Sequence, residues 1–171
     1  KSPFNIIRLE YGQGQPMDSA DSNRYTRAAS TLDAWLKEGI LALEERPAAY
    51  IVEHRFPYQD RIKSRLGLLA RVRLEELDNQ GNIRPHEKTT KEPAADRLNL
   101  LRACRANISP IMGLLGTKKG DIVKTLHGLT KREPDFSATD TYGVNYRVWV
   151  ISDEAALQKV SLLLADQVIY I

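Results

Sequence analysis

The chain has 171 residues, of which 42% are hydrophobic and 27% charged, a globular composition that excludes a disordered or fibrous protein. Its formal net charge of +3 is too small to indicate nucleic acid binding by itself. The apolar runs are too short to span a bilayer, and no signal-peptide pattern opens the chain, so we expect no membrane association. Cys104 is the single cysteine and cannot form an internal disulfide, which is typical of a cytoplasmic protein.

The first half of the chain is predicted to contain three strands and one helix. The predicted elements are a strand over residues 4–10, a helix from Tyr25 to Gly39, and strands over 50–56 and 66–74. The helix follows from apolar residues at helical spacing, with Asp21 or Ser22 as its expected cap. The two later strands follow from alternating apolar and polar residues, joined by a turn at 57–60.

The second half alternates more regularly between helices and strands. The predicted elements are helices over 93–106, 121–129 and 153–165, a strand over 111–115, a hairpin of 136–139 and 144–151, and a final strand over 168–171. Hairpins interleaved with helices predict an α/β or α+β fold with a mixed, largely antiparallel sheet and helices packed on it.

We expect residues 1–171 to form a single domain, because the length is that of one domain. A strand-like run starts almost immediately at Phe4, and the chain stops on the apolar residues 168–171. Natural ends are usually polar and frayed, so we interpret both ends as cuts in a longer protein.

Positive charge is concentrated between residues 82 and 107. This segment holds six Lys or Arg and three acids, an excess equal to the net charge of the whole chain. On a helical projection, three apolar residues share the face that we expect to pack inward: Ala94, Leu98 and Leu101. Three arginines lie on or beside that face, namely Arg97, Arg102 and Arg105, whereas Asp96 and Asn99 point away.

Arginines that face the interior need a negative or polar partner, because an unpaired buried charge is costly. The partner is a carboxylate of the protein, of which Glu87 is nearest in sequence, a bound anion, or backbone carbonyls. Phosphate suits the planar guanidinium fork particularly well. Arginines that reach the helix edge and form only structural ion pairs remain the alternative.

His86 and Glu87 are adjacent and are candidates for acid–base chemistry. No second histidine or cysteine stands at ligand spacing, so a metal site is not expected. No glycine-rich phosphate-binding loop is present either.

Four short strings between residues 84 and 111 resemble the bacterial and archaeal family designated domain of unknown function 1015. They are Arg84–Thr89, Asp96–Leu98, Leu100–Ala103 and Ala106–Ile111. Asn23–Tyr25 and the opening residues also match, so the resemblance covers essentially the whole chain. It implies a longer protein in which a glycine- and histidine-rich segment follows the last strand. It also implies a ParB-like or sulfiredoxin-like fold. Proteins with this fold bind nucleotides, and free-serine kinases are among them.

The resemblance and the inward charge together predict a protein that binds phosphate or a nucleotide such as ATP or ADP. The resemblance implies that the longer protein is a kinase-like phosphotransferase acting on a small molecule, and that the present 171 residues are inactive without the rest. Its expected catalytic residues are His86 and Glu87, and its expected anion-binding residues are Arg97, Arg102, Arg105, Asn107 and Ser109. The alternatives are a DNA-binding transcriptional regulator and a structural domain with no site of its own. Nucleic acid is not the expected partner, because no helix-turn-helix pair with an exposed basic helix is present.

Overall fold

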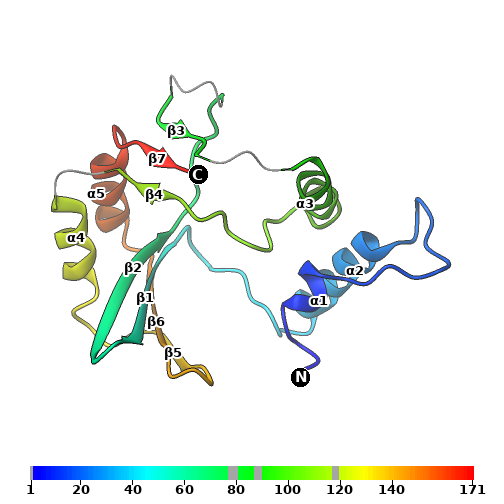
Figure 1. Ribbon diagram of the computed structural model, residues 1–171, viewed down its shortest axis with the longest axis horizontal. Coiled ribbons are helices and arrows are strands. Elements are labelled where there is room, and N and C mark those ends of the chain that lie inside the picture. The colour runs from blue at the N-terminus through cyan, green and yellow to red at the C-terminus, as the bar shows by residue number, and fades with distance from the viewer. Residues whose placement is uncertain (1, 77–80, 87–89, 117–119) are drawn as a thin grey trace. The chain divides into compact units, whose positions relative to one another are not determined.

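The computed structural model describes residues 2–76, 81–86, 90–116 and 120–171. The chain divides into two compact units: unit 1 comprises Lys1–Leu43 and Glu87–Met112, and unit 2 comprises Glu44–His86 and Gly113–Ile171 (Figure 1). The predicted fold class is confirmed, since the structure is mixed α/β with a mostly antiparallel sheet and helices packed on it. None of the described helices is long and apolar enough to cross a membrane.

Unit 1 contains helices α1 (Ile7–Glu10), α2 (Arg24–Lys37) and α3 (Lys91–Cys104). The strand predicted over residues 4–10 is wrong, because Ile7–Glu10 form one helical turn. The Asn5 side chain accepts a hydrogen bond from the Ile7 amide (3.0 Å) and starts this turn. Leu9 is buried, and the Phe4 ring packs edge-on against Trp35. The apolar residues of positions 4–10 therefore pack a short helix against α2, and they do not form a strand.

Helix α2 confirms the helix predicted from Tyr25, but its cap lies one or two residues later than expected. The Asn23 side chain accepts hydrogen bonds from the Tyr25 and Thr26 amides, and the Thr26 hydroxyl accepts one from the Asn23 amide. This reciprocal capping box satisfies backbone donors that the first turn leaves free. It fixes the start of the helix and thereby the direction of Arg24.

The inward face predicted for α3 is wrong. Leu100 is the buried residue, with 5% of its surface exposed, whereas Leu98 and Leu101 are 43% and 39% exposed. The helix also ends at Cys104, and Arg105 follows as the C-cap in the left-handed conformation with φ 50°. Leucines occur on both sides of this helix, so periodicity does not single out one face, and packing against α2 selects the side of Leu100.

Unit 2 is built on a four-stranded antiparallel sheet, sheet A, in the order β2-β1-β6-β5. Its strands are β1 (Ala49–Tyr58), β2 (Arg61–Leu69), β5 (Phe136–Thr139) and β6 (Asn145–Ile151). The predicted hairpin of β5 and β6 is confirmed. Strand β2 begins five residues earlier than predicted, because Gln59 adopts φ 52° and permits a tight turn directly after Tyr58.

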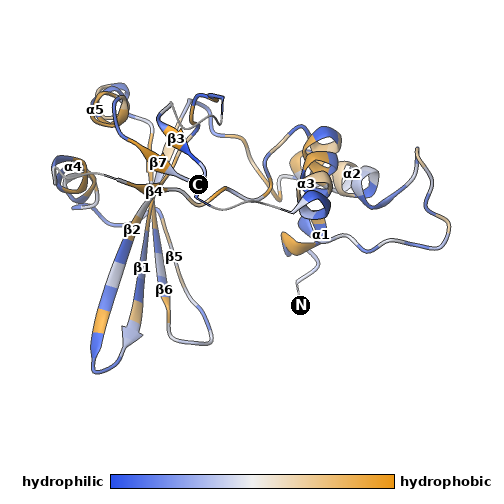
Figure 2. Cartoon of the chain, turned by 45° about the horizontal axis from the view of Figure 1, so that its top comes forward, coloured by the Kyte–Doolittle hydropathy of each residue, from blue (hydrophilic) through white to orange (hydrophobic). Residues whose placement is uncertain are grey.

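Helices α4 (Asp121–Leu129) and α5 (Glu154–Leu164) cover one face of sheet A, and both match their predicted ranges closely. In Figure 2, where hydrophobic residues are orange, much of α5 is orange. The core comprises residues from both helices and the two central strands: Ile51, Ile122, Leu126, Trp149, Ile151 and Val160. Burial of these side chains is the main source of stability in unit 2.

A second, three-stranded sheet of unit 2 has the order β3-β7-β4. Strand β7 (Ile169–Tyr170) pairs parallel to β3 (Ile83–Arg84) and antiparallel to β4 (Leu114–Leu115). Residues Gly113 and Gly116 flank β4 and lie directly against β7. A Cβ atom on Gly113 would lie 2.7 Å from Ile169 Cγ2, closer than packed carbon atoms tolerate.

We therefore expect Gly113→Ala to lower the free energy of unfolding by about 1–2 kcal/mol, because the β-branched Ile169 cannot easily turn away. The control is Gly128→Ala within α4, where a new Cβ meets no atom within 4 Å. We expect Gly128→Ala to raise the free energy of unfolding by about 0.5–1 kcal/mol, because alanine has a higher helix propensity than glycine. Urea unfolding measures the stability of both variants. If Gly113→Ala is as stable as Gly128→Ala, the contact with Ile169 is unimportant.

Candidate functional site

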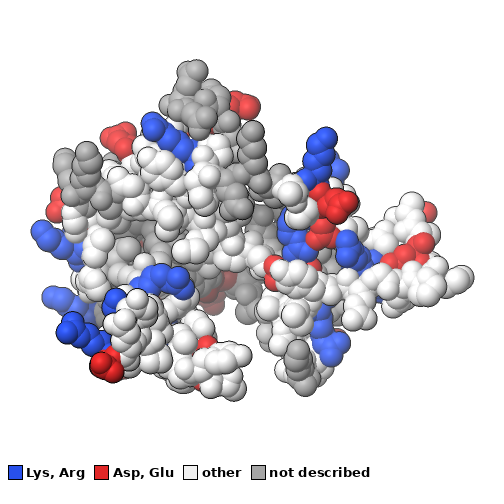
Figure 3. All heavy atoms as spheres, in the orientation of Figure 1, with Lys and Arg blue, Asp and Glu red and all other residues white. Residues whose placement is uncertain are grey.

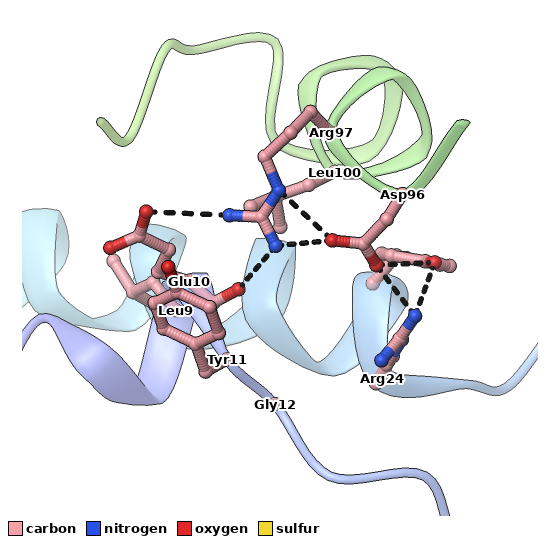
Figure 4. Close-up of a pocket in the computed structure, with 9 residues that line it drawn as sticks. Leu9, Glu10, Tyr11, Gly12, Arg24, Asp96, Arg97 and Leu100 are labelled. Atoms are coloured by element: carbon pink, nitrogen blue, oxygen red, sulfur yellow. Dashed lines mark hydrogen bonds and ion pairs between the residues drawn. The ribbon is translucent and has the colours of Figure 1, made fainter. Parts of the chain in front are cut away.

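The candidate site is a pocket of about 160 Å³ within unit 1 (Figure 4). Residues of α1, α2 and α3 and the segment after α1 line it: Leu9, Glu10, Tyr11, Gly12, Arg24, Tyr25, Asp96, Arg97 and Leu100. We call these nine residues the polar pocket. Leu9 and Leu100 are buried, so the charged side chains stand above an apolar floor.

Asp96 lies between Arg97 and Arg24 in the polar pocket (Figure 4). Its Oδ1 atom accepts hydrogen bonds from Arg24 Nη2 at 2.5 Å and from the Tyr25 hydroxyl at 2.9 Å. Its Oδ2 atom accepts from Arg97 Nε at 2.9 Å and also from Arg97 Nη2. The expectation that Asp96 points away from the protein is wrong, because its carboxylate joins α2 to α3.

Arg97 binds groups of the protein with each of its guanidinium nitrogens. Besides Asp96, it donates to Glu10 Oε1 at 3.3 Å and to the Glu10 backbone carbonyl at 3.0 Å. The Tyr11 ring lies under its guanidinium group, 5.2 Å from ring centre to Cζ, which adds a cation–π interaction. The partners of Arg97 are thus two carboxylates and a carbonyl of unit 1.

Arg24 is the less saturated of the two arginines. Its Nη2 atom serves both Asp96 and the Tyr25 hydroxyl (2.8 Å), and 42% of its side chain is exposed. Its Nε and Nη1 atoms donate to no group in the described part of the chain. Two charged N–H donor groups therefore remain open to a ligand at this edge of the pocket.

The Asp96 carboxylate stays ionised in this setting. Burial by itself raises the pKa of Asp96, but hydrogen bonds from Arg97 and Tyr25 and the charges of both arginines outweigh it, so the pKa lies below 3.8. The hydrogen bond with Tyr25 and the charge of Asp96 raise the pKa of Arg24 above its ordinary value, against the opposing effect of burial. Two cations and two anions then face each other, so the charges of the polar pocket balance.

Gly12 closes one side of the pocket near the start of α2. A Cβ atom on Gly12 would lie 3.4 Å from both the Cβ atom and the carbonyl oxygen of Arg24. A side chain at this position would therefore begin in van der Waals contact with Arg24, the residue with open donors.

Of the predicted anion-binding residues, the structure brings Arg97 and Ser109 together, and both donate to Glu10 Oε1. Arg102, Arg105 and Asn107 are exposed, and their side chains form no ion pair or hydrogen bond with any described residue. The prediction that Arg102 and Arg105 face inward is wrong, because α3 turns its Leu100 side inward and ends before Arg105.

The two predicted catalytic residues are His86 and Glu87. His86 is exposed and belongs to unit 2, where its backbone amide donates to the Ile171 carbonyl at 2.8 Å. Glu87 lies outside the described residues. Among the residues described, no three His, Cys, Asp or Glu side chains lie close enough together to hold a metal ion.

Sequence reasoning missed five polar residues of the site: Glu10, Tyr11, Arg24, Tyr25 and Asp96. Arg24 and Asp96 are 72 positions apart and Glu10 and Arg97 are 87 apart, so no local pattern links them. Two strings that carry the family resemblance, Asn23–Tyr25 and Asp96–Leu98, do contain both arginines and Asp96. Treating these strings as one site would have located four of the nine pocket residues, including both arginines and Asp96.

Comparison with known proteins gives one positive finding. The family described as "Protein of unknown function (DUF1015)" matches residues 1–171. No curated protein and no solved structure matches the chain. The match covers the full length and agrees with the motifs around Arg84–Thr89 and Asp96–Ile111, and the chain therefore belongs to the DUF1015 family.

Proposed function

We propose that the polar pocket binds a small anionic ligand, a phosphate ester or a nucleotide such as ATP or ADP, as part of a kinase-like phosphotransferase. The observation that supports this is the pair of open N–H donor groups on Arg24, beside two tyrosines and above an apolar floor. Charged donors held in place by a neighbouring carboxylate bind phosphate oxygens without first having to be ordered.

The balance of charge in the pocket restricts the ligand. Asp96 and Glu10 repel an anion that approaches Arg97, so the anionic group must lie on the Arg24 side. Donor groups of the same ligand, such as hydroxyl or amino groups, suit the carboxylate oxygens of Glu10 and Asp96. We therefore propose a ligand with one compact anionic group and at least one hydrogen-bond donor.

In this proposal Arg97 holds Asp96 and Glu10 in place, and Arg24 contacts the ligand. Ser109 supports the same Glu10 carboxylate. The acid–base roles of His86 and Glu87, and contacts from Arg105 and Asn107, stay predictions. Arg102 is exposed and does not line the polar pocket, so it has no role in this proposal.

The test is calorimetric titration of the chain with ATP, ADP, pyrophosphate and phosphoserine at low salt. We expect at least one to bind, and we expect Arg24→Gln to weaken that binding about tenfold, the loss of charged hydrogen bonds that are partly exposed. Arg102→Gln is the matched control, because Arg102 is an exposed arginine of the same unit outside the pocket.

Two results would contradict the proposal. One is that none of the four anions binds. The other is that Arg102→Gln weakens binding as much as Arg24→Gln, because binding would then depend on general positive charge and not on the polar pocket.

A further inference from the structure

The second feature of interest is the face of sheet A that lies opposite the core. Along β1, Ala49, Ile51 and Glu53 are buried on the side of α4 and α5. Side chains alternate along a strand, so His54 lies on that opposite face and Phe56 and Tyr58 follow it there. The register places Lys63 opposite Phe56, Arg65 opposite His54, and Tyr146 of β6 on the other side of His54.

We call this surface the basic-aromatic face and define it by three aromatic and three basic residues: Phe56, Tyr58, Tyr146, Arg61, Lys63 and Arg65. In the described part of unit 2, the helices that pack on sheet A do so from the other side. Tyr58 is 48% exposed, and all three basic side chains are exposed. The Tyr58 ring and the three charges are therefore accessible within unit 2, whereas Phe56 and Tyr146 are half-buried.

Contacts across the strands hold these side chains in place. Arg65 Nη2 donates to His54 Nδ1 at 2.7 Å, and the His54 ring packs edge-on against Tyr146 with 4.8 Å between ring centres. Lys63 Nζ lies 4.0 Å from the centre of the Tyr58 ring. Burial and then the charge of Arg65 lower the pKa of His54, so the imidazole is neutral at pH 7 and accepts from Arg65.

The strand residues of this face carry charge of one sign. All four strands of sheet A are described, and Glu53 is the one acid among them. It lies on the core side, where Arg147 pairs with it. Acids of the adjoining segments include Asp60 in the β1–β2 turn. Asp140 accepts from the Tyr146 hydroxyl at 3.0 Å, and Glu44 accepts from the Tyr50 hydroxyl at 2.9 Å. Figure 3 shows Lys and Arg side chains, with an acidic side chain beside them, around the end of the β1–β2 hairpin.

The basic residues lie along β2, an edge strand, and the aromatic residues lie on the inner strands β1 and β6. Arg61, Lys63 and Arg65 alternate with residues of the other face, so their charges repeat about every 6.6–6.8 Å. A negatively charged chain that follows this edge can place a series of flat groups over the rings. Single-stranded nucleic acid has this combination of a repeating phosphate backbone and flat bases.

We propose that the basic-aromatic face binds single-stranded RNA or DNA, with phosphates at Arg61, Lys63 and Arg65 and bases stacked on Phe56, Tyr58 and Tyr146. This proposal concerns unit 2 and is independent of the polar pocket in unit 1. It also differs from a helix-turn-helix regulator, because a sheet and not a helix makes the contacts. Bases in a duplex are already stacked on each other and cannot reach the rings, so duplex DNA binds weakly here.

The experiment measures fluorescence anisotropy of a labelled single strand of about twelve nucleotides, within the usual site size, titrated with the whole chain at low salt. We expect binding that weakens as salt increases. Lys63→Gln/Arg65→Gln should weaken it at least about tenfold and reduce the salt dependence. Tyr58→Leu should weaken it about fivefold with little change in the salt dependence, because stacking is lost and charge is kept.

Arg55→Gln is the control, since Arg55 is an exposed cation of the neighbouring strand β1 whose side chain points to the other face of sheet A. It should leave binding unchanged. Far-ultraviolet circular dichroism checks that each variant is folded, and Arg61→Gln/Lys63→Gln replaces the first double variant if that one unfolds.

Three results would overturn the proposal. The first is the absence of binding at low salt. The second is an Arg55→Gln effect equal to that of Lys63→Gln/Arg65→Gln. The third is that an equally long duplex or polyglutamate binds as tightly as the single strand, because charge alone would then explain the interaction.

Discussion

Trp149→Ala is expected to lower the free energy of unfolding by about 3–5 kcal/mol, the range for truncating a large buried aromatic residue. Trp149 is 1% exposed and lies on the central strand β6, opposite Ile51 of β1. Its indole Nε1 donates to the Arg132 carbonyl at 2.9 Å. The alanine variant loses packing against α4 and α5, leaves a cavity, and deprives that carbonyl of its partner.

Circular dichroism in urea measures this change, with Tyr142→Ala as the control. Tyr142 is 84% exposed, so its truncation should change the stability by no more than about 0.5 kcal/mol. Hydrogen exchange should increase in the peptides of β1, β6 and α5, which share the core with Trp149. A Trp149→Ala variant as stable as the Tyr142→Ala variant would show that the core of unit 2 is not where the structure places it.

Asp96→Asn is expected to lower the free energy of unfolding by about 2–3 kcal/mol at pH 7. The Asp96 side chain is 22% exposed and accepts from three side chains: Arg24, Tyr25 and Arg97. An amide keeps the shape but loses the charge and presents an N–H group to an arginine. Charged hydrogen bonds contribute more than neutral ones, and the partial exposure of both arginines limits the loss.

The control is Asp21→Asn, because Asp21 is exposed and its side chain has no partner among the residues described. It should change the stability by no more than about 0.5 kcal/mol. Hydrogen exchange should rise in α2 and α3 of Asp96→Asn and remain unchanged in sheet A. Equal stabilities of the two variants would show that the Asp96 contacts do not hold α2 and α3 together.

The same contacts make the effect depend on pH. The pKa of Asp96 is lower in the folded chain than its ordinary value of 3.8, so its contribution is complete above that pH. It decreases as the pH falls through the folded pKa, where the carboxylate becomes protonated. The stability difference between wild type and Asp96→Asn should therefore shrink below pH 4.

Local sequence determined most of the secondary structure. Helix α4 and the β5–β6 hairpin occur where periodicity predicts them, because the apolar pattern of each matches one structure only. The errors occur where local patterns are ambiguous. Residues 4–10 alternate too little to distinguish a strand from a helical turn, and the early turn at Gln59 depends on one backbone angle.

The candidate site, too, was only partly determined by local sequence. Sequence by itself determined the fold class, the family, and the concentration of charge that includes Asp96 and Arg97. Only tertiary structure decided which side of α3 faces inward, and that packing brings Arg24 and Glu10 to Asp96 and Arg97. The physical reason is that helical spacing specifies which residues share a face, whereas the residues that meet that face come from elsewhere in the chain.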